Sequence, residues 1–117
     1  MENLLIATVL CMALDVATGV AGAVKSGALK SGKMREGLWH KAGFFGLIAL
    51  AYLLEFAASV ADLGISVPAV SAVCVFVILT EVVSIVENLC VLNPDIRDSP
   101  VGKTLASPGG EAGEKEE

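Results

Sequence analysis

Three carboxylates stand inside apolar stretches of this sequence, at Asp15, Glu55 and Glu81, and none of them has a Lys or Arg within its own stretch. An ionisable side chain near the middle of a membrane-spanning helix costs about 2.5–3.5 kcal/mol, and such residues commonly hold protons or cations or line a polar path. We therefore expect these three groups to be either protonated or hydrated in a cavity.

Other polar and small residues accompany each carboxylate at steps of three and four, which places them on one face of a helix. The three polar faces are Thr8, Cys11, Asp15, Thr18, Gly22 and Lys25; Tyr52, Glu55, Ser59 and Asp62; and Glu81, Ser84 and Asn88 with Thr80 and Glu87 beside them. Such faces must meet protein, water or each other. Small residues spaced four apart, Ala17 with Ala21 and Gly19 with Ala23, also let helices approach closely in lipid. Together these features favour a homo-oligomer.

The apolar stretches around these residues lie at about 4–24, 42–62 and 65–92, and each is long enough to cross a membrane as a helix of about 20 residues. Of the 117 residues, 55% are hydrophobic, and a soluble bundle would show one apolar stripe per helix instead. The third stretch is rich in Val and Ile, but no Gly or Pro interrupts 69–92, and strands usually end at about 10 residues. We predict an all-α integral membrane protein whose three transmembrane helices are formed by residues 1–93.

Basic residues are concentrated between the first two stretches, in a loop predicted at 25–41. They are Lys25, Lys30, Lys33, Arg35 and Lys41, against the single acid Glu36. The positive-inside rule places this loop in the cytoplasm, the N-terminus outside and the C-terminus inside. Trp39 stands among these cations as an interfacial anchor, and 33–41 is expected to form a helical lead-in to the second span. The sequence thus predicts a multi-pass protein embedded in a lipid bilayer.

The composition changes after Asn93. Three prolines, at 94, 100 and 108, precede an end that is rich in Gly and Glu. A segment of this kind has few apolar residues to pack, so we predict that 94–117 form a disordered, acidic cytoplasmic tail.

No catalytic constellation accompanies these features. The chain has a single His, His40, and no nucleophile beside a base. The cysteines Cys11, Cys74 and Cys90 are isolated, with neither metal-ligand nor redox spacing. The basic cluster is short, flanks an apolar stretch and is balanced by an acidic tail, unlike a nucleic-acid-binding surface. We expect no enzyme, no cofactor, no metal site and no nucleic-acid partner.

Three elements occur in a fixed order along the chain. They are Leu14-Asp15-Val16-Ala17-Thr18-Gly19, Met34-Arg35-Glu36-Gly37-Leu38 and Glu81-Val82-Val83-Ser84-Ile85-Val86-Glu87-Asn88. Over about residues 4–93 the chain resembles the phage holins of the toxin-secretion/phage-lysis type. The family-type positions are Asp15, Thr18, Gly19, Met34, Arg35, Gly37, Glu81, Glu87 and Asn88. Holin tails are often basic, whereas this one is acidic.

The resemblance implies a non-enzymatic bacteriophage protein. Such holins accumulate in the cytoplasmic membrane of the host and assemble into lesions, through which an endolysin reaches the cell wall or a toxin escapes. Pore formation of this kind triggers host cell lysis. A holin gene is expected to lie beside an endolysin gene.

Two other functions agree with the residues alone. Membrane carboxylates also serve small proton-coupled transporters and channel subunits, although small exporters usually have a fourth span. Such a protein would give drug- or proton-dependent flux without lysis. The third interpretation is a small membrane subunit of a larger complex.

Overall fold

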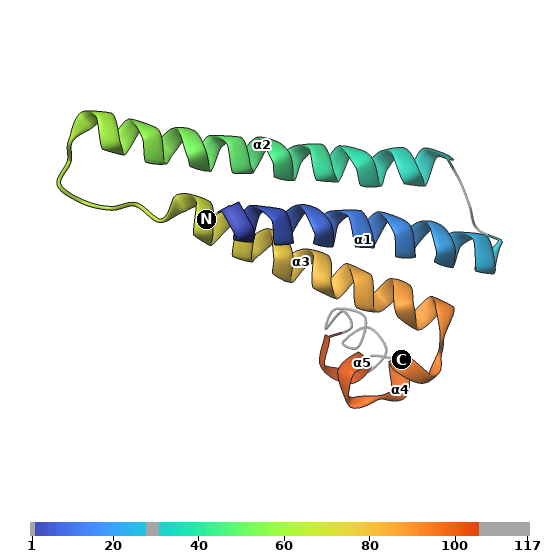
Figure 1. The fold of residues 1–117 in the computed structure, drawn as a ribbon. Helices are drawn as coiled ribbons and strands as arrows, with labels where there is room; N and C mark the ends of the chain where they lie inside the picture. Colours follow the sequence, from blue (N-terminus) through green and yellow to red (C-terminus); the bar gives the residue numbers. More distant parts are fainter. Residues whose placement is uncertain (1, 28–30, 106–117) are drawn as a thin grey trace, which may run out of the picture.

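The computed structural model describes residues 2–27 and 31–105, which fold into three long helices and two short ones (Figure 1). The long helices are α1 (Glu2–Ser26), α2 (Ser31–Ala61) and α3 (Ala69–Leu92), and the short ones are α4 (Asp95–Asp98) and α5 (Pro100–Leu105). Each long helix is long and apolar enough to cross a membrane. The predicted all-α fold with three membrane-spanning helices is confirmed.

The ends of the helices differ from those expected. α1 ends before Gly27, whose φ of +71° lies in the left-handed region that commonly terminates helices. α2 begins at Ser31 rather than near 42, so the helical lead-in expected at 33–41 is continuous with the second span and little of the predicted loop 25–41 remains; Lys30 lies outside the described residues. α3 begins at Ala69 rather than 65, because Pro68 keeps the residue before it out of the helical backbone region.

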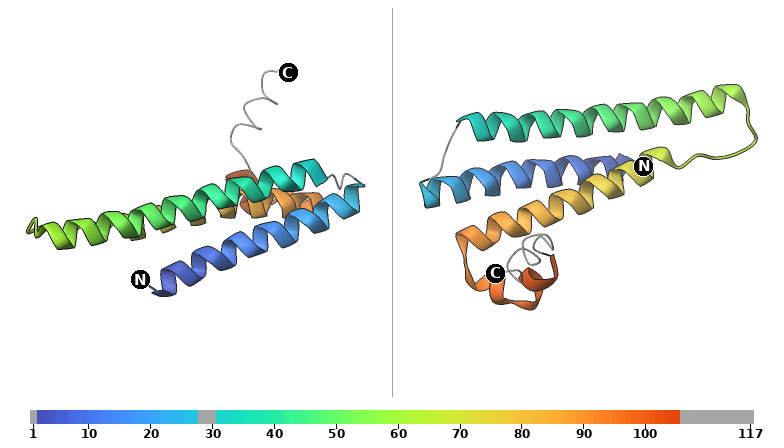
Figure 2. Two further views of the ribbon diagram at one scale, coloured as in Figure 1. Left: turned by 90° about the horizontal axis from the view of Figure 1, so that it is seen from above. Right: turned by 180° about the vertical axis from the view of Figure 1, so that it is seen from behind.

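α3 is the central helix of the bundle. It contacts α1 along most of its length and α2 over a shorter distance, whereas α1 and α2 scarcely touch. α1 and α3 run in the same direction and α2 runs against them (Figures 1 and 2). The end of the bundle that holds Lys25 and Lys33 is called the basic end below.

The apolar core lies toward the opposite end. Ala51, Val70 and Cys74 are buried together there, and partly buried apolar side chains from α1 and α3 pack around them. The outer faces of the long helices carry exposed large apolar side chains, among them Leu10 and Phe56. Such faces suit contact with lipid, where each helix satisfies its own backbone groups.

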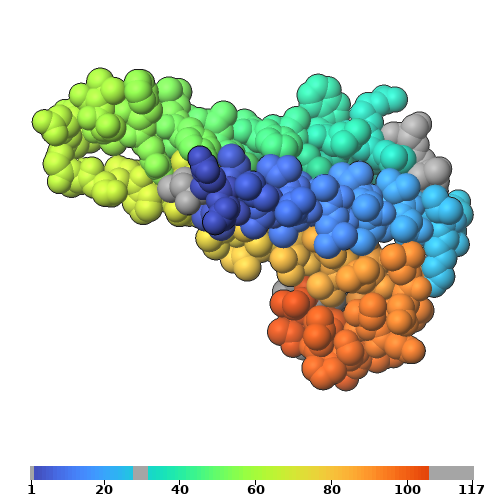
Figure 3. Space-filling view, in the orientation of Figure 1, coloured from blue at the N-terminus to red at the C-terminus, as the bar shows by residue number. Residues whose placement is uncertain are grey.

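α4 and α5 fold the chain back beside the end of α3, where they form a separate lobe (Figure 3). The structure corrects the prediction that the tail is disordered from residue 94, since 95–105 are largely helical; residues 106–117 lie outside the described part. Short-range bonds close this lobe, because Ser99 Oγ accepts from Gly102 N at 3.2 Å and donates to the carbonyl of Ile96. Gly102 is buried, and a Cβ there would overlap the Ile96 carbonyl oxygen.

Replacing Gly102 with Ala is expected to break the α4–α5 lobe and leave the three long helices intact, because the added methyl group has no room. The loosened segment should be cleaved by trypsin at Arg97 and Lys103 several-fold faster than in the wild type. Limited proteolysis in detergent micelles with mass spectrometry measures this. Gly43→Ala is the control, since a Cβ at Gly43 meets open space; unchanged cleavage of Gly102→Ala would contradict the packing described.

Candidate functional site

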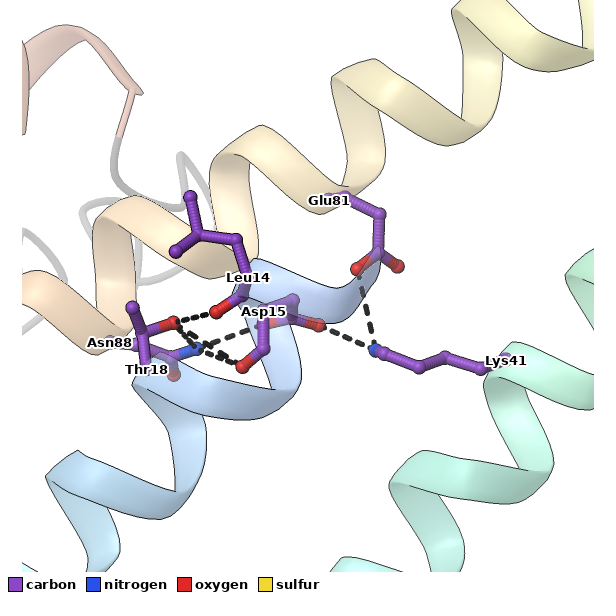
Figure 4. A network of polar contacts seen from close by, with 6 residues as sticks. All are labelled: Leu14, Asp15, Thr18, Lys41, Glu81 and Asn88. Atoms are coloured by element: carbon purple, nitrogen blue, oxygen red, sulfur yellow. Dashed lines mark hydrogen bonds and ion pairs between the residues drawn. The ribbon is translucent and has the colours of Figure 1, made fainter. Parts of the chain in front are cut away.

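Lys41 of α2 joins the three long helices. Its Nζ lies 2.6 Å from Asp15 Oδ2 on α1 and 3.3 Å from Glu81 Oε2 on α3 (Figure 4). The side chains of Lys41, Asp15 and Glu81 are 14%, 15% and 3% exposed, so these charges are largely withdrawn from the surroundings. One cation thus meets two carboxylates from two other helices.

Asn88 and Thr18 extend this cluster along the contact between α1 and α3. Asn88 Nδ2 donates to Asp15 Oδ1 at 2.8 Å and to Thr18 Oγ1 at 3.0 Å, and Thr18 Oγ1 in turn donates to the Leu14 carbonyl at 2.8 Å (Figure 4). Asp15 therefore has both carboxylate oxygens engaged, one by Lys41 and the other by Asn88. Lys41, Asp15, Glu81, Asn88 and Thr18 are called the polar junction below.

Small residues let α1 approach α3 at the polar junction. A Cβ on Gly19 would lie 3.5 Å from Asn88 Nδ2, and one on Gly22 would lie 3.4 Å from a methyl group of Val91. The Gly19–Ala23 pair is thus on the inner side of α1, whereas Ala17 and Ala21 are exposed. The Gly19–Ala23 spacing therefore packs α1 against α3 within the bundle, whereas the Ala17–Ala21 spacing faces outward.

The charges of the polar junction do not balance. Two carboxylates and one ammonium leave one negative charge when all three are ionised. Among the described residues, Glu81 Oε2 finds no hydrogen-bond donor, and its 3.3 Å contact with Lys41 is an ion pair only. A buried acceptor without a donor costs about 1–3 kcal/mol, and more for a charged group. Glu81 is therefore the least satisfied group of the junction.

Two further charged side chains bind the ends of α3. Glu55 Oε2 accepts a hydrogen bond from Val70 N at 2.7 Å, in the first turn of α3, which has no side-chain cap of its own. Lys25 Nζ donates to the carbonyls of Val91 and Leu92 at 2.9 and 3.0 Å in the last turn. A carboxylate at the N-terminus and an ammonium at the C-terminus both suit the helix dipole. Glu55 therefore stabilises α3 from a place outside the polar junction.

The sequence offers none of the three carboxylates a basic partner within its own stretch, and the structure gives Asp15 and Glu81 one from another helix, Lys41. This pairing was missed because Lys41 was placed at the membrane surface, at the end of the helical lead-in 33–41, whereas α2 carries it into the bundle. The sequence contains a pattern that indicates this position of Lys41. Its spacing of seven residues from Ile48, and of seven more to Glu55, places the three side chains on one helix face. Ile48 is buried, as that face requires.

The remaining predicted site residues are spread more widely. The first polar face does turn inward, since Thr8, Thr18 and Gly22 are buried and Asp15 is half-buried. On the second face Tyr52 and Ser59 are exposed. On the third, Ser84 and Glu87 are half-buried beside Asn88. At the basic end Lys33 and Arg35 are exposed, and Trp39 is exposed farther along α2.

Within 2–27 and 31–105, no group of His, Cys, Asp or Glu is arranged to hold a metal ion.

Replacing Lys41 with Met should destabilise the bundle by about 3 kcal/mol, because removing one partner of a buried ion pair leaves the other charge uncompensated. Reversible unfolding in mixed micelles, followed by helical circular dichroism, measures this loss. Adding Asp15→Asn and Glu81→Gln to Lys41→Met should recover most of it, since no unpaired charge is left. Additive losses in the triple variant would show that the ion pairs do not hold the junction.

Replacing Glu55 with Leu should cost about 1–2 kcal/mol, because the buried Val70 N–H loses its acceptor and the start of α3 loses a favourable charge. Glu55→Gln keeps an acceptor oxygen and should lose less than half as much. The same unfolding measurement applies. Glu36→Leu is the control, as Glu36 is an exposed acid on the same helix; an equal effect of both Leu variants would argue against the cap.

A sequence model described as the bacteriophage holin family matches residues 1–99 of the 117. No curated protein and no solved structure matches the chain. With three apolar helices, the chain is a multi-pass membrane protein. Because the match covers most of its length, the protein belongs to the bacteriophage holin family.

Proposed function

We propose that this protein is a holin that assembles in the bacterial cytoplasmic membrane into lesions, which release an endolysin in phage lysis or a toxin. The family match and the three apolar helices support this function. The observation that carries it is the placement of charge: polar groups of three spanning helices converge inside the bundle, and one side chain, Lys41, connects α2 to them. Such a chain contains buried polar surface that can line an aqueous hole once the helices separate.

α2 is held by few interactions. Besides the ion pairs of Lys41, it contributes the Glu55 cap on α3, an edge-to-face contact of Phe44 with Phe76 of α3, and the buried residues Ile48 and Ala51. In lipid no hydrophobic force drives helices together, so polar contacts and close packing decide which helices stay associated. α1 and α3 share a long contact with the Asn88 bonds at its centre, whereas α2 has a shorter one. Separation of α2 from the α1–α3 pair is therefore the opening step that disturbs the structure least.

Separation of α2 would uncover Asp15, Glu81 and Asn88. Each ionisable group left facing lipid costs about 2.5–3.5 kcal/mol, so the uncovered faces of several copies gather around water rather than lipid. The sequence alone suggests that monomers hide their polar faces against one another. In the structure these faces meet within one chain instead, so we propose that homo-oligomerisation accompanies the departure of α2.

The proposed topology has the basic end in the cytoplasm and the N-terminus outside. Lys25 lies at the end of α1 and Lys33 and Arg35 at the start of α2, and cations at this end of the bundle favour the cytoplasmic surface. The connection between α2 and α3 lies at the opposite end (Figure 1), and its charged residue is Asp62.

The second candidate is a small proton-coupled transporter or channel subunit. The polar junction favours the transporter function, because two carboxylates that share one cation within a membrane can bind and release a proton. The two functions differ in what they do to a cell. A holin abolishes the membrane potential suddenly and permits lysis, whereas a transporter moves protons or drugs through an intact membrane.

Induced expression together with a cytoplasmic endolysin is expected to cause sudden loss of membrane potential followed by lysis. Lys41→Met should bring lysis forward, because it weakens the link that holds α2, while Lys41→Arg should stay near wild-type timing. Lys33→Met is the matched control, since the exposed Lys33 makes no ion pair within the described part of the chain. Culture turbidity and a potential-sensitive dye give the two times.

Two outcomes would contradict this proposal. Proton or drug flux with the membrane potential retained and no lysis would favour the transporter. Lysis by the wild type with identical timing in Lys41→Met and Lys33→Met would leave the holin function standing and exclude the separation of α2 as the opening step.

A further inference from the structure

A groove of about 350 Å³ runs between α1 and the first half of α2, with α3 behind it. Asp15 and Lys41 line its inner end, Val20 and Leu38 its walls, and Ser26 and Lys33 the part nearest the basic end. The side chains of Asp15 and Lys41 keep 15% and 14% of their surface exposed beside this space. The groove thus leads from the basic end to the polar junction.

The length of the groove brings it to the middle of the membrane. Ser26 and Asp15 are eleven residues apart on α1, which is about 16 Å along a helix. The hydrocarbon core of a bilayer is about 30 Å thick. In a chain that spans the membrane, the inner end of the groove therefore lies near the bilayer centre.

We propose that the groove is filled with water from the basic end as far as the polar junction, so that the closed chain already contains half of an aqueous path across the membrane. Asp15 and Lys41 keep exposed edges beside the groove, and an acyl chain there would leave these two charged groups against hydrocarbon. A water molecule takes about 30 Å³ of liquid, so the space suffices for about a dozen. Water entering from the surface would solvate the exposed edges of both side chains.

The other half of the bundle is dry. Beyond the junction Met12, Ile48 and Val77 are buried, followed by the core of Ala51, Val70 and Cys74. A hydrophobic constriction of this kind stops water by dewetting. The polar junction then marks the boundary between a hydrated half and a dry half. The inference requires only that the helices span a membrane, and it does not depend on lysis.

Cysteine accessibility tests this boundary. In a background with Cys11, Cys74 and Cys90 replaced by Ala, single cysteines are placed at neighbouring positions of equal depth. Val16, which is 37% exposed, and Val20 line the groove, whereas the exposed Ala17 and Ala21 lie outside its lining. A charged, membrane-impermeant thiol reagent is applied to each side of vesicles in turn. A lipid-soluble maleimide then counts the thiols that remain.

Because the reacting species is the thiolate, which lipid disfavours, we expect Val16→Cys and Val20→Cys to react about tenfold faster or more than Ala17→Cys and Ala21→Cys. The reaction should occur from one side only. A variant that retains Cys74 alone should stay unreactive from both sides, since Cys74 lies in the dry core. The comparison of Val16→Cys with Ala17→Cys is independent of that of Val20→Cys with Ala21→Cys. Either comparison tests the proposal if a variant of the other fails to accumulate.

Three results would overturn the proposal. Slow reaction at Val16→Cys and Val20→Cys with full maleimide labelling would mean that lipid or a second chain fills the groove. Fast reaction at Ala17→Cys and Ala21→Cys as well would mean that the helix does not lie in the bilayer as described. Reaction of Cys74 with the charged reagent would show that water reaches the apolar core, so that no half of the bundle is dry. Lysis timing of the wild type is measured separately, so failure of the groove and failure of the holin function are distinguishable.

Discussion

The ion pairs of Lys41 are the interaction on which the arrangement of this bundle depends. Lipid gives helices no hydrophobic reason to associate, and it penalises every polar group that is left exposed. α1 and α3 meet this constraint between themselves, through Asn88, Thr18 and the close approach at Gly19. α2 has no such long contact, and the ammonium of Lys41 placed between Asp15 and Glu81 is the one side chain that binds it to both other helices by ion pairs within the described residues.

The same constraint explains why α3 is central. Its first turn is bound by Glu55 of α2, its middle by the polar junction and its last turn by Lys25 of α1. These groups divide the bundle into two halves of different character. The half toward the basic end carries cations, the groove and the junction, whereas the other half is packed with buried apolar side chains. In the function proposed above, the packed half would keep the bundle closed until α2 separates, and the polar half would then supply the surface of the hole.

Much of this could be predicted from the sequence, and the misses have physical causes. Length and hydropathy suffice for three spanning helices, because lipid requires a continuous helix wherever apolar residues persist. The spacing of Asp15, Thr18, Glu81 and Asn88 correctly placed them on inward faces. The pairing of Lys41 was missed because its charge suggested the membrane surface, although its seven-residue spacing from Ile48 indicates a shared helix face. The contact of Glu55 with the start of α3 and the α4–α5 lobe were missed because they depend on contacts between segments, which local composition does not encode.

The surplus carboxylate of the polar junction fits a protein built to leave its closed state. With Asp15 held by both Lys41 and Asn88, Glu81 retains a weak ion pair and an oxygen without a hydrogen bond in the described structure. One acid matched to one base would make the junction neutral and the closed bundle more stable. When Glu81 is ionised, the second buried acid lowers the stability of the closed bundle, because one of its oxygens has no hydrogen-bond donor. In the opening step proposed above, loss of the Lys41 ion pairs would free α2 and expose Glu81 to water at the same time.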